Sequence, residues 1–196
     1  MAFKLNDNAF TGLEAAIVLI AFVVVAAVFS YVVLGAGFFT TQKSQEVVQT
    51  SMQQASSSLE VIGNVYGMQS GANNYLGYIK FTVGNTAGGT ALDVSKMVIS
   101  YQDSSTRWAN LSYAGVNATP TSVTNTQAWG INQTINDVGT PNTLLEPGEQ
   151  FILLVGVPTS ATPNTIMTIN LQPSIGAVFQ IKRTVPPALN PVNILY

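Results

Sequence analysis

AAIVLIAFVVVAAVFSYVVLGAGFF, residues 15–39, is the stretch that decides the fold of this chain. It runs for 25 residues without a charged side chain, and roughly 20 apolar residues suffice for an α-helix to cross a bilayer. The stretch is apolar all round and not along one stripe, so we expect lipid or other helices to cover the helix on every side. A lone carboxylate, Glu14, comes immediately before it.

The segment before this stretch is short and polar, MAFKLNDNA over residues 1–9, with Lys4 as its basic residue. An ordinary secretory signal has an apolar core of roughly 7–15 residues and is cut after it, at small residues. Gly35-Ala36-Gly37 could serve as such a site, but the core before it is too long.

The helical pattern continues beyond the apolar stretch. Apolar residues recur there at spacings of three and four, as on one face of a helix; they are Val47, Val48, Met52, Ala55, Leu59 and Ile62. We therefore predict a helix over residues 10–68, about 84 Å long from Thr11. Residues 66–74, YGMQSGANN, contain two glycines and no apolar period, which predicts a hinge between the helix and the rest of the chain.

The remainder, residues 69–196, is predicted to be an all-β domain. Its strand-like segments are rich in β-branched and aromatic residues, and Gly, Pro, Asn and Asp separate them. About seven short strands of this kind favour an immunoglobulin-like sandwich. The fold class is therefore α+β, a long hydrophobic helix followed by a β-sandwich head. The predicted strands are residues 75–83, 92–102, 107–113, 129–135, 150–157, 165–171 and 177–184.

Composition excludes several classes of function. The chain contains no His and no Cys, which removes Cys/His metal sites, thiol nucleophiles and His-based catalytic triads. Seven scattered Lys and Arg residues do not form the basic patch that nucleic-acid binding requires. We expect neither an enzyme nor a cofactor. Charged residues are only 8% of the chain, a surface suited to being covered by neighbouring copies or by glycans.

The residue pattern alone allows two interpretations of the position of the Glu14 carboxylate. A carboxylate at the end of a membrane helix is costly unless it reaches the interface or is paired. It could simply lie at the interface near the helix N-terminus, where the helix dipole favours a negative charge. It could instead pair with a positive group.

The sequence around Glu14 resembles the processing junction of type IV pilin-like subunits. The residues that carry the resemblance are Ala9-Phe10-Thr11-Gly12-Leu13-Glu14. It implies that a membrane peptidase cuts between Ala9 and Phe10, removing residues 1–9 as a leader. The freed amine of Phe10 and the carboxylate of Glu14 would then be the groups that pair during assembly.

Three stretches of the head are similar to archaeal flagellins (archaellins): residues 85–101 (NTAGGTALDVSKMVISY), 145–151 (LEPGEQF) and 176–186 (GAVFQIKRTVP). The resemblance implies a structural subunit of the archaellum, the archaeal swimming filament. Its helix would be inserted in the membrane before assembly and packed with its own copies in an extracellular helical homopolymer afterwards. Its other implied partners are the leader peptidase and the membrane assembly machinery, and a separate motor would drive rotation.

Two groups of head residues are further candidates for sites. The sequons Asn110-Leu-Ser, Asn117-Ala-Thr and Asn132-Gln-Thr predict N-glycosylation, which is bulky and solubilising. Acidic residues of the head could supply oxygens to Ca²⁺, but they lack EF-hand spacing and are interpreted as solvated turn carboxylates. Those acidic residues are Asp93, Asp103, Asp137, Glu146 and Glu149.

Two alternative functions remain open at this point. One is an adhesive archaeal type IV pilin, with the same helix and a different head. The other is a membrane-anchored sugar-binding surface module that uses Trp108 and Trp129 as an exposed platform. Tryptophans in predicted strands are also typical of a sandwich core.

Overall fold

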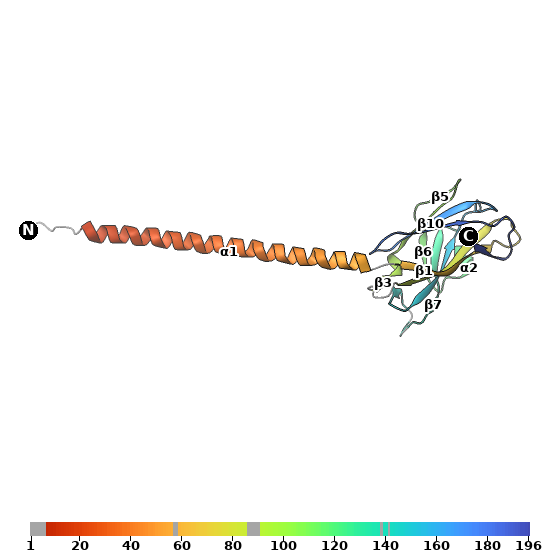
Figure 1. The fold of residues 1–196 in the computed structure, drawn as a ribbon, viewed down its shortest axis with the longest axis horizontal. Helices are drawn as coiled ribbons and strands as arrows, with labels where there is room; N and C mark the ends of the chain where they lie inside the picture. Colours follow the sequence, from red (N-terminus) through yellow and green to blue (C-terminus); the bar gives the residue numbers. More distant parts are fainter. Residues whose placement is uncertain (1–6, 57–58, 86–90, 138, 141) are drawn as a thin grey trace, which may run out of the picture. The chain divides into compact units, whose positions relative to one another are not determined.

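The structure of the chain is a computed structural model that describes residues 7–56, 59–85, 91–137, 139–140 and 142–196. The chain divides into two compact units, residues 1–50 and 51–196. The first consists of the N-terminal helix, and the second contains all the strands of the described chain and is called the head below (Figure 1).

Helix α1 runs from Asp7 to Ser56, 50 residues, or about 75 Å at 1.5 Å per residue. Its apolar stretch is rich in Val and Ile, which are weak helix formers in water. In an apolar environment, however, a helix is favoured because it pairs all of its interior backbone N–H and C=O groups within one segment. The fold therefore suits a segment that is never in contact with bulk water.

The prediction that the helix continues to Met68 is wrong. Leu59 to Gln69 form strand β1, and the hinge predicted at residues 66–74 lies partly inside that strand. The spacing of Leu59 and Ile62 imitates a helix, but residues 59–69 are rich in β-branched side chains, which fit a pleated sheet. Strand β1 is paired on both sides, with β2 and with β12, and these pairings override the local pattern.

The largest sheet of the head has six strands in the order β12-β1-β2-β9-β7-β6. All neighbours are antiparallel except β6 and β7, which are parallel. The strands not yet given are β2 (Leu76–Asn85), β6 (Ser112–Val116), β7 (Ala128–Ile135), β9 (Gln150–Gly156) and β12 (Val192–Leu195).

A four-stranded sheet in the order β11-β10-β4-β5 forms the second layer, and β3 pairs with β8 in a short ladder. These strands are β3 (Leu92–Asp93), β4 (Val98–Gln102), β5 (Arg107–Trp108), β8 (Leu144–Leu145), β10 (Ile166–Gln172) and β11 (Phe179–Thr184). Two short helices, η1 (Val94–Lys96) and α2 (Pro120–Val123), lie in the connections.

One hydrophobic core joins the two main sheets. Alternate residues of each strand point into it, as the two-residue period of a strand requires: Ile79, Phe81 and Val83 of β2 meet Ile99 and Tyr101 of β4 in one buried cluster. The sandwich head predicted from the sequence is confirmed. The predicted strand over residues 92–102 is interrupted by η1, and β12, which closes one edge of the larger sheet, was not predicted.

Candidate assembly site

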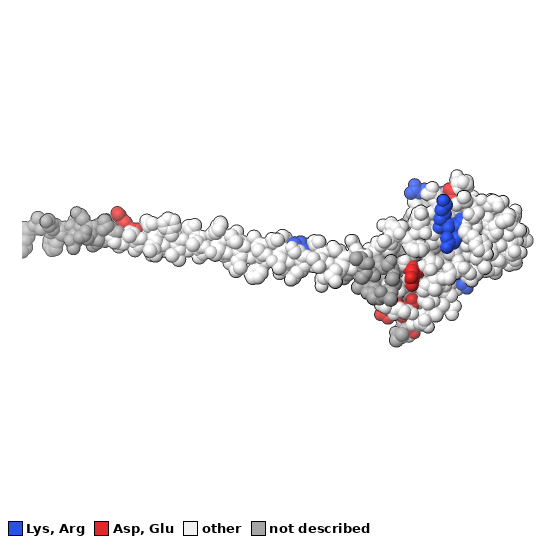
Figure 2. All heavy atoms as spheres, in the orientation of Figure 1, with Lys and Arg blue, Asp and Glu red and all other residues white. Residues whose placement is uncertain are grey.

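The surface of α1 is apolar along most of its length. Its large hydrophobic side chains between Leu13 and Met52 are each between 53% and 79% exposed. The segment Gly12–Met52 is long and apolar enough to cross a membrane, and no part of its most apolar window is buried in the structure. Figure 2 shows the helix almost free of charged side chains. Such a surface requires a covering by lipid or protein.

Several polar groups in the second half of α1 are paired within the helix. Thr40 Oγ1 donates to the Ala36 carbonyl at 2.8 Å, and Thr41 Oγ1 donates to the Gly37 carbonyl at 2.9 Å. Lys43 Nζ and Glu46 Oε2 form an ion pair at 2.6 Å, one turn apart. Internal pairing of this kind lowers the cost of covering the helix with other helices. The i,i+3 spacing of Lys43 and Glu46 was a signal for this pair that the sequence reasoning missed.

Glu14 lies at the other end of this surface. With Ala15, Val18, Leu19 and Phe22 it lines a shallow groove along the helix. Lys43, the one basic residue between positions 12 and 52, lies about 44 Å further along the helix axis. The described part of α1 therefore offers Glu14 no cation of its own.

The predicted cleavage residues, Ala9 and Phe10, lie in the first turns of α1. Their side chains are outside the described part of the structure, so the leader boundary stays a prediction.

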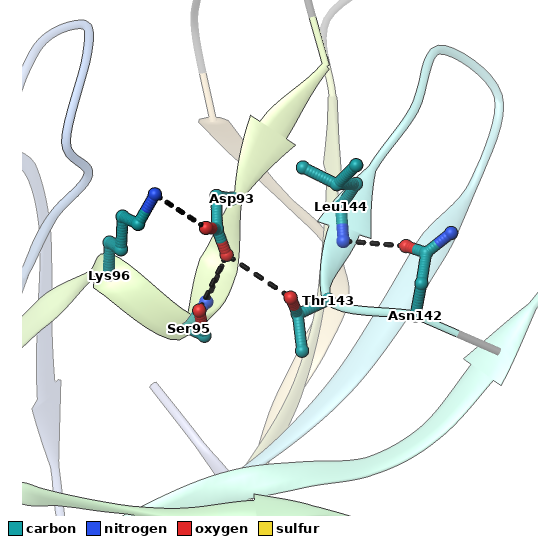
Figure 3. A network of polar contacts seen from close by, with 6 residues as sticks. All are labelled: Asp93, Ser95, Lys96, Asn142, Thr143 and Leu144. Carbon is teal, nitrogen blue, oxygen red and sulfur yellow. Dashed lines mark hydrogen bonds and ion pairs between the residues drawn. The ribbon is translucent and has the colours of Figure 1, made fainter.

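Asp93 is a structural carboxylate, and its contacts are drawn in Figure 3. Its Oδ1 accepts hydrogen bonds from Ser95 N at 3.1 Å, Ser95 Oγ at 2.6 Å and Thr143 Oγ1 at 3.2 Å. Its Oδ2 pairs with Lys96 Nζ at 3.1 Å. The hydrogen bond from Ser95, aided by Lys96 and Thr143, lowers the pKa of Asp93 against the opposing effect of burial. The carboxylate fixes the start of η1 and ties β3 to the segment that enters β8.

Asp103 holds the turn after β4 in a similar way. Its Oδ1 accepts from the backbone N–H groups of Ser105 at 2.7 Å and Thr106 at 2.6 Å. Its Oδ2 accepts from Tyr101 Oη at 2.9 Å and Ser160 Oγ at 2.5 Å. Burial raises the pKa of Asp103, but these hydrogen bonds outweigh burial, and the net pKa is lowered.

These carboxylates are engaged in turns and do not converge on a common point. Among the described residues, no group of three or more His, Cys, Asp or Glu side chains could hold a metal ion. The calcium site considered from the sequence would need such a group. Among the described residues, the carboxylates considered for Ca²⁺ therefore do not form the cluster that this hypothesis needs.

The three predicted glycosylation residues differ in their surroundings. Asn110 and Asn117 are exposed and lie at the two ends of β6. Asn132, on β7, is half-buried, and its Nδ2 donates to the Ala118 carbonyl at 2.8 Å. A glycan is linked through this same nitrogen. The geometry thus favours Asn110 and Asn117 as acceptors over Asn132.

The two tryptophans do not form an exposed platform. Trp129 is fully buried in the sandwich core beside Tyr113, with ring centroids 4.7 Å apart. Trp108 is half-buried and packs against Tyr101 at 5.9 Å. The hypothesis of a sugar-binding platform made of both rings is therefore wrong, since Trp129 cannot be reached from solvent. Both residues stabilise the core.

Comparisons with known proteins place this geometry in a family. The sequence matches the archaeal-type flagellin family over residues 9–183. It is 39% identical to probable flagellin 1 of Archaeoglobus fulgidus over 204 aligned positions, which cover 100% of this chain and 98% of that protein.

Two solved structures have the same fold. The archaeal flagellum of Methanospirillum hungatei matches with a TM-score of 0.70 and 33% identity, covering 94% of this chain and 98% of that one. The flagellin FlaB1 of Methanocaldococcus jannaschii matches with a TM-score of 0.59 and 18% identity over 71% of this chain and 96% of that one, a likeness of fold alone. The family match extends through the head, which separates this chain from a pilin with a different head. The chain belongs to the archaeal-type flagellin family.

Proposed function

We infer that the chain is a structural subunit of the archaellum filament and that it polymerises through α1. The observation that carries this conclusion is the exposed apolar surface of α1, in a chain that belongs to the flagellin family. Burial of that surface against copies of itself contributes roughly 25 cal/mol per Å². A repeated contact that does not close into a ring extends as a helical filament. The role is structural and not enzymatic.

The polar segment over residues 1–9 is proposed to be a leader that a membrane peptidase removes by cutting between Ala9 and Phe10. Two observations support this proposal. The segment precedes an apolar stretch that is too long for a secretory signal, and Glu14 stands at the fourth position after Phe10. Until assembly, the apolar stretch holds the subunit in the membrane, where the assembly machinery collects it.

Glu14 is proposed to pair with the freed amine of Phe10, its own or a neighbour's. An uncompensated carboxylate in a packed apolar core is strongly unfavourable, whereas a well-placed pair offsets much of that cost. The support is that Lys43 is already paired with Glu46 and lies far along the helix. A new amine at Phe10 would lie within about one helical turn of Glu14.

The finished filament is proposed to lie outside the cell, with the heads on its exterior. Glycans at Asn110 and Asn117 would suit that position, because both side chains are exposed on a head that carries few charges. A glycan hydrates a surface that lacks charged side chains.

The test uses Glu14→Ala beside a control, Lys182→Ala, which removes an exposed charge from β11, on the outer face of the four-stranded sheet. We expect the Glu14 variant to be processed and membrane-held but to give few filaments, whereas the control assembles normally. N-terminal sequencing of the wild-type subunit should begin at Phe10. Wild-type filament yield from Glu14→Ala would contradict the pairing. A subunit that begins at Met1, at Ala2 or beyond Gly37 would contradict the proposed cut.

A further inference from the structure

The outer face of the six-stranded sheet, the face turned away from the core, is covered over only part of its width. Above β7 and β9 the chain covers itself with the segment around α2: Ala118 and Val123 are buried there, and so is Leu154 beneath them. A Cβ on Gly130 would lie 2.5 Å from the Ala118 Cβ, so the cover is in close contact with the sheet.

The rest of that outer face, above β12, β1 and the start of β2, is open and carries mainly apolar side chains, with Lys80 opposite Tyr66 and Glu60 near Ile62 as its charged members. The strand register places Tyr66 beside Ile194, and Met68 between Val192 and Tyr78. Val192 is 53% exposed and Ile194 is 40% exposed. Ile62 lies on the same face, because it pairs with Thr82 whereas Tyr66 pairs with Lys80, two residues away on β2. We call these apolar residues the β12 face: Ile62, Tyr66, Met68, Tyr78, Val192 and Ile194.

The outer face of the four-stranded sheet has the opposite character. Polar side chains cross it in a ladder: Gln180 Nε2 donates to Asn170 Oδ1 at 3.1 Å, and Asn170 Nδ2 donates to Ser100 Oγ at 3.3 Å. The two outer faces of the sandwich thus differ: polar side chains cross the four-stranded sheet, although Val98 and Ile166 are exposed on it, whereas the six-stranded sheet is partly covered by its own chain and carries a group of adjacent aliphatic and aromatic side chains. A contiguous apolar patch on a folded domain marks a contact surface.

We propose that a second copy of this chain covers the β12 face in the filament. The proposal rests on the proposed function, because polymerisation through α1 brings many copies of the head together. The predicted glycan sites agree with it: Asn110 and Asn117 flank β6, the edge strand at the far side of the sheet from β12. The β12 face is therefore left free of bulky groups. Its aromatic and aliphatic residues are of the kinds enriched in the buried parts of protein interfaces.

The absence of cysteine from the chain makes a direct test possible. Ile194→Cys places a single thiol on the β12 face. Val98→Cys is the matched control, because Val98 is a β-branched residue of similar exposure, 42%, on the polar outer face. Labelling of each thiol by a maleimide is followed in the detergent-held unassembled subunit, in intact filaments, and in filaments dissociated by heat.

We expect the thiol at position 194 to react in the unassembled and dissociated states and to react at least an order of magnitude more slowly in filaments, because a covered thiol is inaccessible. The thiol at position 98 should react equally in all three states. Val192→Cys repeats the measurement at a second site of the β12 face, where 53% of the side chain is exposed. If both β12-face variants keep protease-resistant heads but are excluded from filaments that accept the Val98 variant, the proposal is also supported.

Equal labelling of position 194 in filaments and in free subunits would overturn the proposal. Protection already present in the unassembled subunit would overturn it as well, because the chain itself would then be the cover. Absence of the wild-type chain from surface filaments would contradict the proposed function itself. Filaments that contain the chain but leave the thiol at position 194 reactive would contradict only the proposal for the β12 face.

Discussion

Phenylalanine has opposite surroundings in the two parts of this molecule. Phe22 on α1 is 71% exposed, whereas Phe81 in the head is 1% exposed. The head buries its apolar residues between two sheets and so completes a core within one chain. Helix α1 has an apolar surface of comparable chemistry and no layer of its own chain that the structure places over it. The head thus buries its apolar side chains within one chain. The apolar surface of the helix needs lipid or copies of the helix to cover it.

A charge in the apolar stretch should have the largest effect. Val25→Asp places a carboxylate on a surface that copies must bury, at a cost of several kcal/mol in each subunit. We expect no filaments, counted by electron microscopy of sheared cell surfaces. The matched variant Gln102→Asp adds the same charge to the exposed end of β4 and should assemble normally. Normal filaments from Val25→Asp would show that α1 is not covered by copies.

Removal of the helix should leave a folded head, provided that β1 is kept. A fragment of residues 59–196 retains the whole six-stranded sheet, and we expect it to be β-rich by circular dichroism and unable to form filaments. A fragment that begins at Asn73 lacks β1, which lies between β12 and β2, and should fail to fold. If the shorter fragment melts cooperatively at the same temperature, β1 is not part of the head.

The two phenylalanines provide the sharpest version of the comparison. Phe81→Ala leaves a cavity in the sandwich core and should lower the free energy of unfolding of the head by about 3–5 kcal/mol. Phe22→Ala should leave that free energy unchanged and instead lower the temperature at which filaments dissociate. Calorimetry of dissociated subunits and of intact filaments separates the two effects. A large loss of head stability from Phe22→Ala would contradict the claim that Phe22 contributes to filament stability and not to the stability of the head.

Acid should act on the head through its turn carboxylates, with the smallest of the four effects. The pKa values of Asp93 and Asp103 are lowered from 3.8 in the folded head. Their contribution to stability is therefore full above the unfolded value and is lost as pH falls through the lower folded values. Asp103→Asn should cost about 1–2 kcal/mol at neutral pH.

The same variant should flatten the loss of stability below about pH 4, as measured by thermal unfolding against pH. Glu60→Gln, which alters an exposed carboxylate of β1, is the control and should leave the profile as it is in the wild type. If the pH dependence of thermal unfolding is unchanged in Asp103→Asn, Asp103 does not contribute to the acid sensitivity of the head.

The sequence predicted those parts of the fold in which local pattern and tertiary environment agree. Residues 15–39 can only be a covered helix, and β2, β7, β9, β10 and β11 have alternating or β-branched patterns that the sheets use directly. Prediction failed where pairing across the chain decides the structure. Leu59 and Ile62 have helical spacing, yet they lie in a strand because that segment pairs with β2.

The candidate sites show the same division. That Glu14 stands at the end of an apolar helix can be read from the order of residues. The engagement of the Asn132 amide with Ala118 cannot be, because it depends on a contact between β7 and the segment after β6. The sequence likewise has Val192 and Ile194 far from Tyr66, and only the register of β12 on β1 brings them to one face.

The most direct test of polymerisation through α1 is an electron cryomicroscopy structure of sheared surface filaments whose subunits are identified as this chain by mass spectrometry. We predict that α1 of many copies packs along the filament axis, with Val25 and Phe22 in contact with other copies and the heads outside. Filaments of this chain held together by their heads alone, with residues 15–39 facing solvent, would contradict the account.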